Sequence, residues 1–380
     1  MQLRPIALCA LLLGSACAQD SISFNYIYYD EDSGRTTIES PHLHITKELG
    51  TDYVVEFSYA YDSVSGASPT FYDAASGASA KVPKGVLLPQ DIVYGDIPYE
   101  DQRRAYQATI TKRLPQSRDE ITAGWSFSKE HDYISRELSV QYLHYTDKSK
   151  NRSLTFGLSY QLNHPKIYCF LNTGDCDSDT GASVKTKRAE VITAEIGATQ
   201  ILTRSSLVKG SIFYIGENSY LSNPYMRVVR YYDTYAPKIT PERKPSERKA
   251  YGVTIKYKKA YKNHIYGDVA YRLYHDDWDI TSHTLTASLT QEWSDRLATT
   301  IKLRLYRQSE AEFYSGAKDY FTDQKYASSD RRLSSFGSAE ATLCLKYRIN
   351  DTIALDVEGS FYHQKYFDAT YGSIGVEYRF

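Results

Sequence analysis

Apolar and polar residues alternate with a period of two along most of the chain beyond residue 20. Residues two apart in an extended strand lie on the same face of a sheet, so each of these segments has one apolar and one polar face. The last such segment carries Ile374, Val376, Tyr378 and Phe380 on its apolar face. The pattern therefore predicts an all-β fold, without a second domain built on a helical core.

Three details favour an antiparallel transmembrane β-barrel over a soluble sandwich, which would also alternate. The polar faces carry charges of both signs on many strands, as a water-filled lumen would. The alternating segments are about ten residues or longer, which suffices for a tilted membrane crossing. The chain also ends in an aromatic residue, Phe380, on the face that it shares with Tyr378. A terminal Phe in this setting resembles the signal read by the barrel-assembly machinery, so we expect these two residues to form an assembly signal.

The composition agrees with strands that cross a bilayer and contact its lipid. The chain has 36 Tyr and 13 Phe, and Tyr suits a membrane interface, with its ring among the acyl chains and its hydroxyl in water. Beyond Ala18 no stretch is apolar enough for a membrane helix, which excludes a helical membrane protein but not a barrel, whose strands look only half apolar. The formal net charge of −1 gives no nucleic-acid signature.

The N-terminus has the features of a Sec-type signal peptide over residues 1–18. Arg4 supplies a positive region, residues 6–13 an apolar core, and Ala16-Cys17-Ala18 a cleavage site, so we expect the mature chain to start at Gln19. The apolar run is too short for a membrane anchor. A lipoprotein signal with the lipid on Cys17 is the alternative, although Gly14 stands where such signals usually have Leu. The expected location is the outer membrane of a bacterium with two membranes.

Counting the alternating segments predicts about sixteen strands in a barrel domain over residues 19–380. We expect them at residues 21–29, 36–48, 52–63, 103–114, 119–130, 133–146, 152–163, 185–201, 205–217, 247–260, 263–275, 281–293, 296–309, 332–349, 352–363 and 370–380. An even number of strands with both termini in the periplasm is typical of bacterial outer-membrane barrels. Fourteen strands is the alternative if two short segments are misread.

The connections between these segments fall into two alternating sets, one of them short throughout. Every long connection belongs to the other set: residues 64–102, 164–184, 218–246 and 310–331. Barrels of this kind have short periplasmic turns and longer outer loops, so we expect these four connections to be extracellular. The stretch 230–249 is rich in Pro, Lys, Arg and Glu and is expected to be a solvated loop.

Three cysteines remain after removal of the signal peptide. Cys169 and Cys176 lie in a polar loop and can close a small disulfide in an oxidising compartment. Free thiols and a metal site are the alternatives, but no nearby His or Cys completes a set of metal ligands. Cys344 stands alone within a strand and alternates with apolar neighbours, so we expect it to face the lumen.

Several local motifs, taken in order through nearly all of the mature chain, go beyond composition. They are residues 61–70 (YDSVSGASPT), 75–79 (ASGAS), 131–136 (HDYISR), 220–225 (YLSNPY), 276–284 (DDWDITSHT), 307–314 (RQSEAEFY) and 328–337 (SSDRRLSSFG). Together they resemble a family of predicted outer-membrane barrels of unknown function. That family often neighbours an enzyme that attaches flavin mononucleotide (FMN) to proteins, and thioredoxin-like and small lipoprotein partners. The resemblance implies a fold and a context, not an activity.

The sequence carries no motif of a hydrolase, a nucleotide-binding protein or a metalloenzyme, and we expect no enzyme activity. Ser282 and His283 lie near Asp279, but neighbours in an extended chain point to opposite faces, which disfavours a catalytic triad. The acidic group formed by His275, Asp276, Asp277 and Asp279 can hold a divalent cation. It also lies at a tight strand connection, where Asp is favoured by turn chemistry alone.

The polar faces of the strands are expected to line the lumen with many charges. They carry Glu56, Glu190, Glu195, Lys256, Asp268, Arg272, Lys302, Arg304, Lys346, Arg348, Asp356, Glu358, Glu377 and Arg379. One interpretation is a selective, porin-like aqueous pore. The other is a lumen braced by charge pairs with loops folded inward, which the mixed signs favour slightly. A barrel of sixteen strands is wide enough to leave a channel unless something fills it.

The segment 61–70 also resembles the acceptor read by flavin transferases. That acceptor has an Asp, two residues, Ser or Thr, Gly-Ala, Ser or Thr, one residue, and then the modified Ser or Thr. The matching residues are Asp62, Ser65, Gly66, Ala67, Ser68 and Thr70. The resemblance implies covalent FMN on Thr70 through a phosphoester bond.

Two weaker copies of this segment end in Lys81 and Lys185 where the acceptor should stand, so we expect neither to be modified. The predicted topology places the first copy outside the cell, whereas such transferases work in the periplasm. Modification therefore precedes membrane insertion, or the topology is inverted there. A flexible loop or a pore constriction are the alternatives for this segment.

Three functions from different classes are consistent with these features. The first is a pore or conduit across the outer membrane, associated with an extracytoplasmic flavin-linked redox system. The second is a redox barrel that carries covalent flavin and exchanges electrons with periplasmic proteins. The third is a barrel that only anchors or scaffolds a partner.

Overall fold

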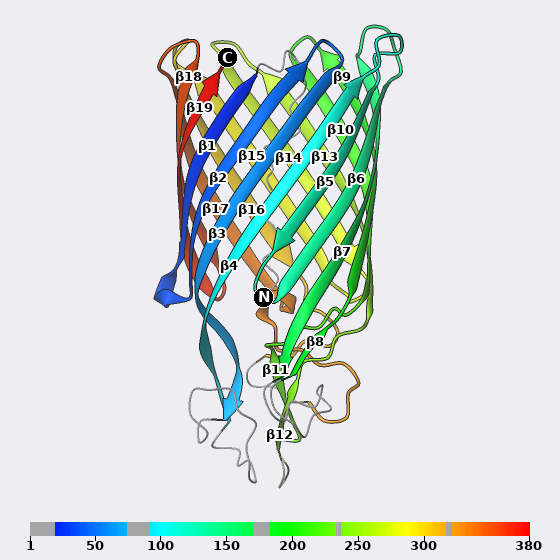
Figure 1. Cartoon of the computed structure of the whole chain (residues 1–380), viewed down its shortest axis with the longest axis vertical. Helices are drawn as coiled ribbons and strands as arrows, with labels where there is room; N and C mark the ends of the chain where they lie inside the picture. Colours follow the sequence, from blue (N-terminus) through cyan, green and yellow to red (C-terminus); the bar gives the residue numbers. More distant parts are fainter. Residues whose placement is uncertain (1–19, 74–91, 170–182, 233, 235–236, 317–320) are drawn as a thin grey trace.

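The alternating segments form a closed antiparallel barrel in the computed structural model (Figure 1). The structure describes residues 20–73, 92–169, 183–232, 234, 237–316 and 321–380. The 16 strands of the barrel are β1 (Ser21–Glu31), β2 (Thr36–Leu49), β3 (Tyr53–Asp73), β4 (Ile92–Arg113), β5 (Glu120–Lys129), β6 (Tyr133–Tyr145), β7 (Arg152–Cys169), β9 (Ala189–Thr203), β10 (Ser206–Ser219), β13 (Glu247–Ala260), β14 (Ile265–Asp276), β15 (Thr281–Glu292), β16 (Leu297–Gln308), β17 (Phe336–Arg348), β18 (Ile353–Gln364) and β19 (Phe367–Arg379). The predicted fold class and strand number are confirmed.

Five short elements lie outside the barrel wall. Strand β8 (Ser183–Thr186) pairs with the end of β7, and β11 (Arg227–Arg230) pairs with β12 (Lys238–Pro241) in a separate hairpin. Two 3-10 turns, η1 (Asp32–Gly34) and η4 (Arg331–Leu333), follow β1 and precede β17.

The barrel closes between its first and last strands. Strand β1 pairs with β19 along its whole length, from Ser21 opposite Arg379 to Glu31 opposite Ala369. Because every strand of a closed barrel has two neighbours, this pairing satisfies the backbone groups that an open sheet would leave exposed at its edges.

The outer face of the wall is apolar, as the alternation predicts. On β16 the outward residues Ile301, Leu303 and Leu305 are each about half exposed (51–54%), while Lys302 and Arg304 point to the other side of the sheet. An outward surface of this kind suits lipid rather than water. Among the described residues no helix is long and apolar enough to span a membrane.

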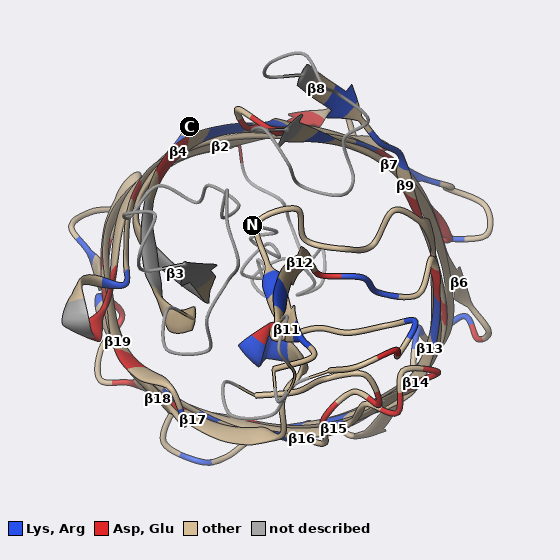
Figure 2. Ribbon diagram, turned by 90° about the horizontal axis from the view of Figure 1, so that it is seen from below, with Lys and Arg blue, Asp and Glu red and all other residues tan. Residues whose placement is uncertain are grey.

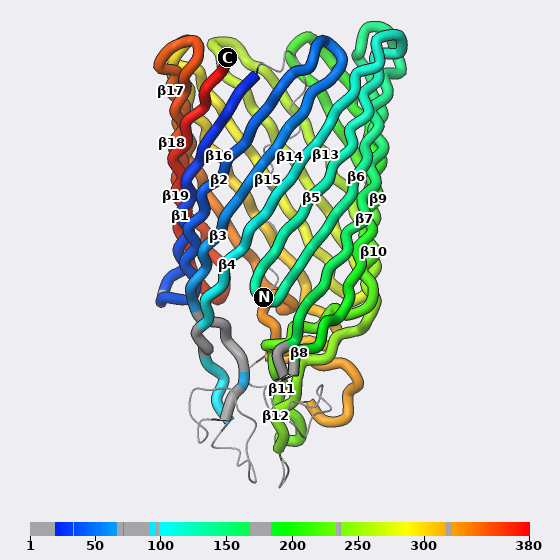
Figure 3. The backbone as a smooth tube through the Cα atoms, viewed as in Figure 1, coloured from blue at the N-terminus to red at the C-terminus, as the bar shows by residue number. Residues whose placement is uncertain are grey.

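The two rims of the barrel differ in the length of their connections (Figure 3). Both ends of the described chain lie at the rim that carries the short turns, which is the upper rim in Figure 1. The β13–β14 turn there has positive φ at Asn263 (60°) and His264 (56°), as a tight type I′ hairpin requires. The four predicted long connections all leave the opposite, loop-bearing rim.

Three of these long connections are partly strand rather than loop, since β11 and β12 lie within residues 218–246 and barrel strands extend into two others, so that part of the prediction is wrong. Strands β3 and β4 stay paired as far as Asp73 opposite Ile92, and they project as a hairpin beyond the rim (Figure 1). β7 likewise continues to Cys169 and pairs with β8. The predicted strand 185–201 is divided between β8 and β9. Extended pairing continues through Pro69 of β3 and Pro165 of β7, although proline cannot donate a backbone hydrogen bond.

Candidate functional site

One half of the lumen wall, from β13 to β19, carries long side chains of both signs that pair with one another. Lys256 lies 3.0 Å from Asp268, Lys302 3.0 Å from Glu358, and Lys346 2.9 Å from Glu377. The first pair connects neighbouring strands, and the other two reach across one intervening strand. Basic residues outnumber acidic ones on this half of the wall. Cys344 lies on the lumen side of β17, as predicted, between strands that carry Lys302 and Glu358.

The predicted lumen-facing residues keep that orientation by alternation, with one exception. Glu190 lies on the outward face of β9, where its carboxylate accepts a hydrogen bond from the Tyr160 hydroxyl at 3.1 Å and pairs with Arg188. The prediction that Glu190 faces the lumen was wrong. Glu190 and Glu195 were both expected on the lumen face, although they are five residues apart. An odd separation puts two residues of a regular strand on opposite faces.

The other half of the wall, from β2 to β9, is mostly lined by small hydroxyl, amide and glycine residues. Its lumen-facing positions include Ser58, Gln107, Ser126, Ser139, Ser159 and Gln161. The Gln161 amide donates to Ser135 at 2.8 Å and to Asn163 at 3.0 Å. This half of the wall is therefore polar, and its charges include the acidic Glu56, Glu137 and Glu195.

Two connections at the loop-bearing rim fold across the opening, as Figure 2 shows. We call residues 220–246, which include β11 and β12, the hairpin loop, and residues 309–335 the capping loop. Backbone hydrogen bonds join them: Tyr231 N–H to Phe321 C=O (2.8 Å), and Ala327 and Arg243 to each other (2.8 and 3.0 Å). Together the two loops form a lid. The prediction of a solvated loop over 230–249 is wrong, because this segment is part of a folded structure.

The lid has an apolar core of its own. Trp278 and Ile280 from the β14–β15 turn pack with Phe313 and Leu333 of the capping loop and with Ala311. The Trp278 and Phe313 rings meet edge to face at a centroid distance of 5.0 Å. A second group buries Val228, Phe321 and Ala327 between the two loops. The lid is thus a packed unit.

Buried ion pairs connect the two loops of the lid. The Lys244 ammonium lies 3.1 Å from Glu242 and 3.3 Å from Asp330, and all three side chains are at most 7% exposed. Glu242 also accepts a hydrogen bond from Ser328, and Asp330 pairs with Arg332 at 2.6 Å. Burial raises the pKa of Glu242. Burial alone would also raise the pKa of Asp330, but the charges of Arg332 and Lys244 outweigh it and lower that pKa.

The lid is anchored to the far wall as well as to the strands that carry it. The Arg331 guanidinium stacks on Tyr94 of β4 (5.1 Å to the ring centroid) and on Tyr366 of the β18–β19 turn (5.0 Å). The Tyr225 hydroxyl donates to Asp132 in the β5–β6 turn. These attachments tie the lid across the opening.

Three carboxylates meet beside this last contact. Asp101 of β4 and Glu130 and Asp132 of the β5–β6 turn each place one oxygen within 4.8 Å of the others. Burial, reinforced by the charge of Asp101, raises the pKa of Glu130 to about 7. No motif in the sequence indicates this group, whose only sequence signal is a pair of acids flanking a short turn.

The acidic turn between β14 and β15 has a structural explanation. One carboxylate oxygen of Asp276 accepts hydrogen bonds from Trp278 N–H and Ile280 N–H, both at 3.0 Å, and the other pairs with Arg248 at 2.5 Å. The His275 ring instead lies on the outer face, where it bonds Thr281 at 2.9 Å. These side chains point to opposite faces, and the geometry supports turn chemistry over a divalent ion site.

Asp279, Ser282 and His283, considered above as a possible catalytic triad, do not point toward one another. Ser282 is buried on the lumen side of β15, whereas His283 is exposed on the outer face and bonds the Tyr271 hydroxyl at 2.6 Å. The Asp279 backbone has φ of 64°, which serves the tight turn.

The flavin-acceptor motif lies in β3, not in a loop. Asp62 is buried on the lumen side and bonds Ser40 and Arg103. Gly66 lies against β2, and a Cβ there would be 2.0 Å from the Arg35 carbonyl oxygen, so glycine is required by strand packing. The backbones of Ser65, Ala67, Ser68 and Thr70 pair with β4, Thr70 opposite Gly95.

Other predicted sites fall at the edges of the described structure. Cys176, Lys81 and residues 75–79 lie outside the described residues, so the disulfide between Cys169 and Cys176 stays a prediction.

Phe380 is on the outward face, 52% exposed, and its ring stacks on Tyr378 at 5.9 Å. The outward orientation of both aromatic residues is as expected.

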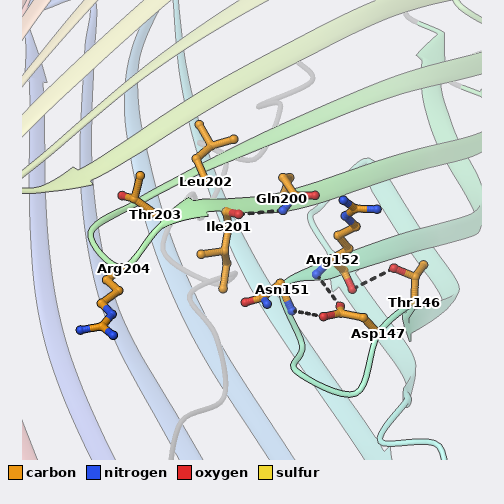
Figure 4. Close-up of a pocket in the computed structure, with 9 residues that line it drawn as sticks. All are labelled: Thr146, Asp147, Asn151, Arg152, Gln200, Ile201, Leu202, Thr203 and Arg204. Atoms are coloured by element: carbon orange, nitrogen blue, oxygen red, sulfur yellow. Dashed lines mark hydrogen bonds between the residues drawn. The ribbon is translucent and has the colours of Figure 1, made fainter.

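A hollow of about 830 Å³ lies at the short-turn rim between the β6–β7 and β9–β10 turns (Figure 4). Asp147 accepts hydrogen bonds there from Asn151 N–H (3.2 Å) and Arg152 N–H (2.9 Å). Its carboxylate is thus used to shape the turn. The hollow lies at the opposite end of the barrel from the lid.

Several solved outer-membrane proteins are similar to this chain at very low sequence identity, with TM-scores below 0.5. The ferric enterobactin receptor PfeA from Pseudomonas aeruginosa is 11% identical, with a TM-score of 0.46, over 92% of this chain and 54% of that chain. The siderophore receptor PirA from Acinetobacter baumannii is 9% identical, with a TM-score of 0.47, over 93% and 54%. A bacterial polysaccharide outer membrane secretin is 9% identical, with a TM-score of 0.49, over 95% and 98%.

The chain spans about half the length of the two receptors. At these identities and TM-scores the likeness supports no conclusion about this chain. No curated protein matches the sequence. A family model does match, over residues 7–376, and it describes a protein of unknown function. The resemblance seen in the motifs is confirmed, and the chain belongs to the DUF3570 family.

Proposed function

We propose that this protein is an outer-membrane conduit for small hydrophilic solutes, narrowed at its extracellular mouth by the lid. The observation that carries the proposal is a wide, polar lumen beneath a lid with its own packed core. Barrels of about sixteen strands leave an aqueous channel when nothing fills them. Here the lumen face is charged and hydroxyl-lined rather than apolar, and the folded loops lie at one mouth (Figure 2).

The lumen chemistry also suggests what would pass. Opposite charges are paired on one half of the wall, as for Lys256 with Asp268, and the small excess of basic residues there is offset by acidic residues such as Glu56 and Glu195 on the other half. Paired charges produce a weaker net field than a ring of one sign, so we expect weak selectivity between cations and anions. Small uncharged polar solutes should pass as well.

Single-channel recording in planar bilayers tests this proposal. The purified full-length barrel should give discrete conductance steps with a cation-to-anion permeability ratio near one. Liposomes that contain it should swell in small sugars. If neither the protein nor a variant with a loosened lid conducts, the conduit proposal fails, and the anchoring or scaffolding role becomes the better explanation.

We further propose that the conduit works with an extracytoplasmic flavin-linked redox system, with Thr70 as a site for covalent FMN. The acceptor-like spacing from Asp62 to Thr70 supports this part of the proposal. In the transfer, the Thr70 hydroxyl oxygen would attack the FMN phosphorus of flavin adenine dinucleotide, and AMP would leave with the pyrophosphate bond broken. A metal on the transferase would neutralise the pyrophosphate. Because residues 66–73 are paired with β4, the transferase would need the chain before the barrel forms.

Coexpression with a flavin transferase should therefore add the mass of one FMN less one water to the wild type. Thr70→Ala should abolish the added mass and the flavin fluorescence in a denaturing gel. Thr70→Ser, which keeps a hydroxyl acceptor, is the matched control and should retain them. Equal flavin on the wild type and on Thr70→Ala, or none on either, would remove this part of the proposal.

A further inference from the structure

Three lysines on two neighbouring strands gather on the lumen face of the wall, close to the short-turn rim. Lys209 of β10 lies directly opposite Lys256 of β13, and Lys258 follows two residues later on the same face of β13. Directly opposite residues of an antiparallel pair have Cβ atoms about 4.5–5.5 Å apart, and diagonal neighbours are about 7–8 Å apart. The three long side chains are each half-buried, and their ammonium groups can reach a common point.

The positive charge of this lysine group is only partly balanced. Asp268 of β14 pairs with Lys256 at 3.0 Å, and its carboxylate also accepts the Ser288 hydroxyl at 2.6 Å. Asp268 is the one described carboxylate whose charge acts on Lys258, against the like charges of Lys256 and Lys209. Neither Lys209 nor Lys258 forms a hydrogen bond or a close ion pair within the described part of the chain. Like charges directly opposite each other destabilise a sheet, so this arrangement favours a bound anion.

The positions around the lysines add hydroxyl groups that can donate to such an anion. On its other side Lys209 lies opposite Thr199 of β9. Ser211 and Thr254 face each other two residues further along β10 and β13, on the same face as the lysines. The next acid on the lumen face of β9 is Glu195, four residues from Thr199 and thus roughly 13 Å along the strand. The lysines therefore lie among donors, with Asp268 as their acidic neighbour.

We propose that Lys209, Lys256 and Lys258 bind a phosphate group inside the lumen. Three ammonium groups beside one carboxylate leave an excess of two positive charges, which matches the charge of a phosphate dianion. Lysine binds phosphate as a compact charge with three donors, and hydrogen bonds between charged partners are the strong ones. Chloride carries a single charge and gains less. The lumen as a whole can still select weakly, because acids on the other half, such as Glu56, offset this local excess.

The position of the lysines gives the site a place along the conduit. Lys258 is two residues from the end of β13, and Lys209 is three residues from the start of β10, so both lie at the end of the lumen away from the lid. A solute that enters past the lid would meet the lysines last, at the periplasmic exit. This consequence rests on the proposed conduit, whereas the binding itself does not.

Isothermal titration of the folded full-length barrel in detergent tests the site, with sodium phosphate and glycerol phosphate as the two probes at constant ionic strength. The wild type should bind at one site. Lys258→Gln should weaken binding by about tenfold or more, because one of the three charges is lost. Lys258→Arg, which keeps the charge, should bind nearly as the wild type does. The matched control is Lys259→Gln, because Lys259 is on the outward face, where its ammonium lies 5.3 Å from the centre of the Tyr261 ring. This control should leave binding unchanged.

The two probes also distinguish the source of the phosphate group. Tighter binding of glycerol phosphate supports a phosphorylated organic solute as the ligand, and binding of inorganic phosphate that is as tight or tighter supports the free ion. The site is overturned if the wild type binds neither probe, if Lys258→Gln binds as the wild type does, or if Lys259→Gln loses as much affinity as Lys258→Gln.

Thermal unfolding separates a phosphate site from lysines with a purely structural role. Without phosphate, Lys258→Gln relieves the repulsion and should unfold at the same or a higher temperature than the wild type. With millimolar phosphate, and NaCl of equal ionic strength as the reference, the order should reverse, because the wild type gains more from the ion. A wild type that is more stable than Lys258→Gln without phosphate, or that gains nothing from phosphate, contradicts the site. Neither readout involves conduction, so failure here is distinguishable from failure of the conduit proposal.

Discussion

Replacing Lys244 by Met should raise the single-channel conductance several-fold by loosening the lid. The substitution keeps the length of the buried side chain but removes the charge between Glu242 and Asp330. Removal of one partner from a buried ion pair typically costs about 3–5 kcal/mol, because the remaining charges are left without compensation. The two loops of the lid should then separate often enough to give frequent large conductance steps.

Lys249→Met is the matched control. Lys249 is 53% exposed, and its ammonium lies 3.5 Å from Glu247 on the outer surface, where such pairs contribute about 0–1 kcal/mol. This variant should conduct as the wild type does. A folded Lys244→Met barrel with wild-type conductance would show that the buried pairs do not hold the mouth closed.

The same variant should respond to pH in a defined direction. Burial raises the pKa of Glu242 in the folded lid above its ordinary value of 4.5. The protonated form is therefore favoured in the lid, and its contribution to lid stability is full below pH 4.5 and declines as the pH rises through the raised pKa. Opening of Lys244→Met should accordingly increase with pH over that window.

Phe380→Asp should reduce the amount of assembled barrel in the outer membrane by an order of magnitude or more. The Phe380 ring is half exposed on the outward face, stacks on Tyr378 and lies under the Lys47 ammonium at 5.1 Å. A carboxylate there would face the lipid boundary and would remove the aromatic residue that we expect the assembly machinery to read. Heat-modifiable mobility of outer-membrane fractions in gels measures the effect.

The variant Leu49→Asp distinguishes a loss of recognition by the assembly machinery from the general cost of placing a charge next to lipid. Leu49 ends β2 at the same rim and is also 52% exposed, so it places the same charge at a comparable depth. We expect a much smaller loss of assembly for Leu49→Asp, and near-normal assembly for Phe380→Tyr. If Phe380→Asp and Leu49→Asp assemble equally well, the terminal residue carries no special signal.

The barrel wall was largely predictable from the sequence, whereas the mouth was not. Alternation identified the sixteen strands, often to within one or two residues, because each strand has one face toward lipid and one toward the lumen. β13 has the predicted bounds, 247–260. This pattern is local, so a single sequence reveals it.

The lid depends on contacts that a local pattern cannot reveal. Glu242 and its partner Ser328 are 86 residues apart, as are Lys244 and Asp330. Considered alone, the charged residues of segment 230–249 predict a solvated loop. Their burial is tolerated only because they pair with residues that are distant in the sequence. The acidic group at Asp101, Glu130 and Asp132 escaped prediction for the same reason, since it combines two strands.

The pairing of β1 with β19 also sets the order of events during biogenesis. The hydrogen bond between Asp368 and Asp32 joins residues that are 336 apart in the chain. Closing a loop of that length costs about 5 kcal/mol of chain entropy before any closing contact forms. The first strand is synthesised before its final neighbour exists, so one of its edges stays unpaired until β19 arrives. Until the barrel closes, this unpaired edge can template pairing with another chain, so closure by β19 also removes the site at which two copies could aggregate.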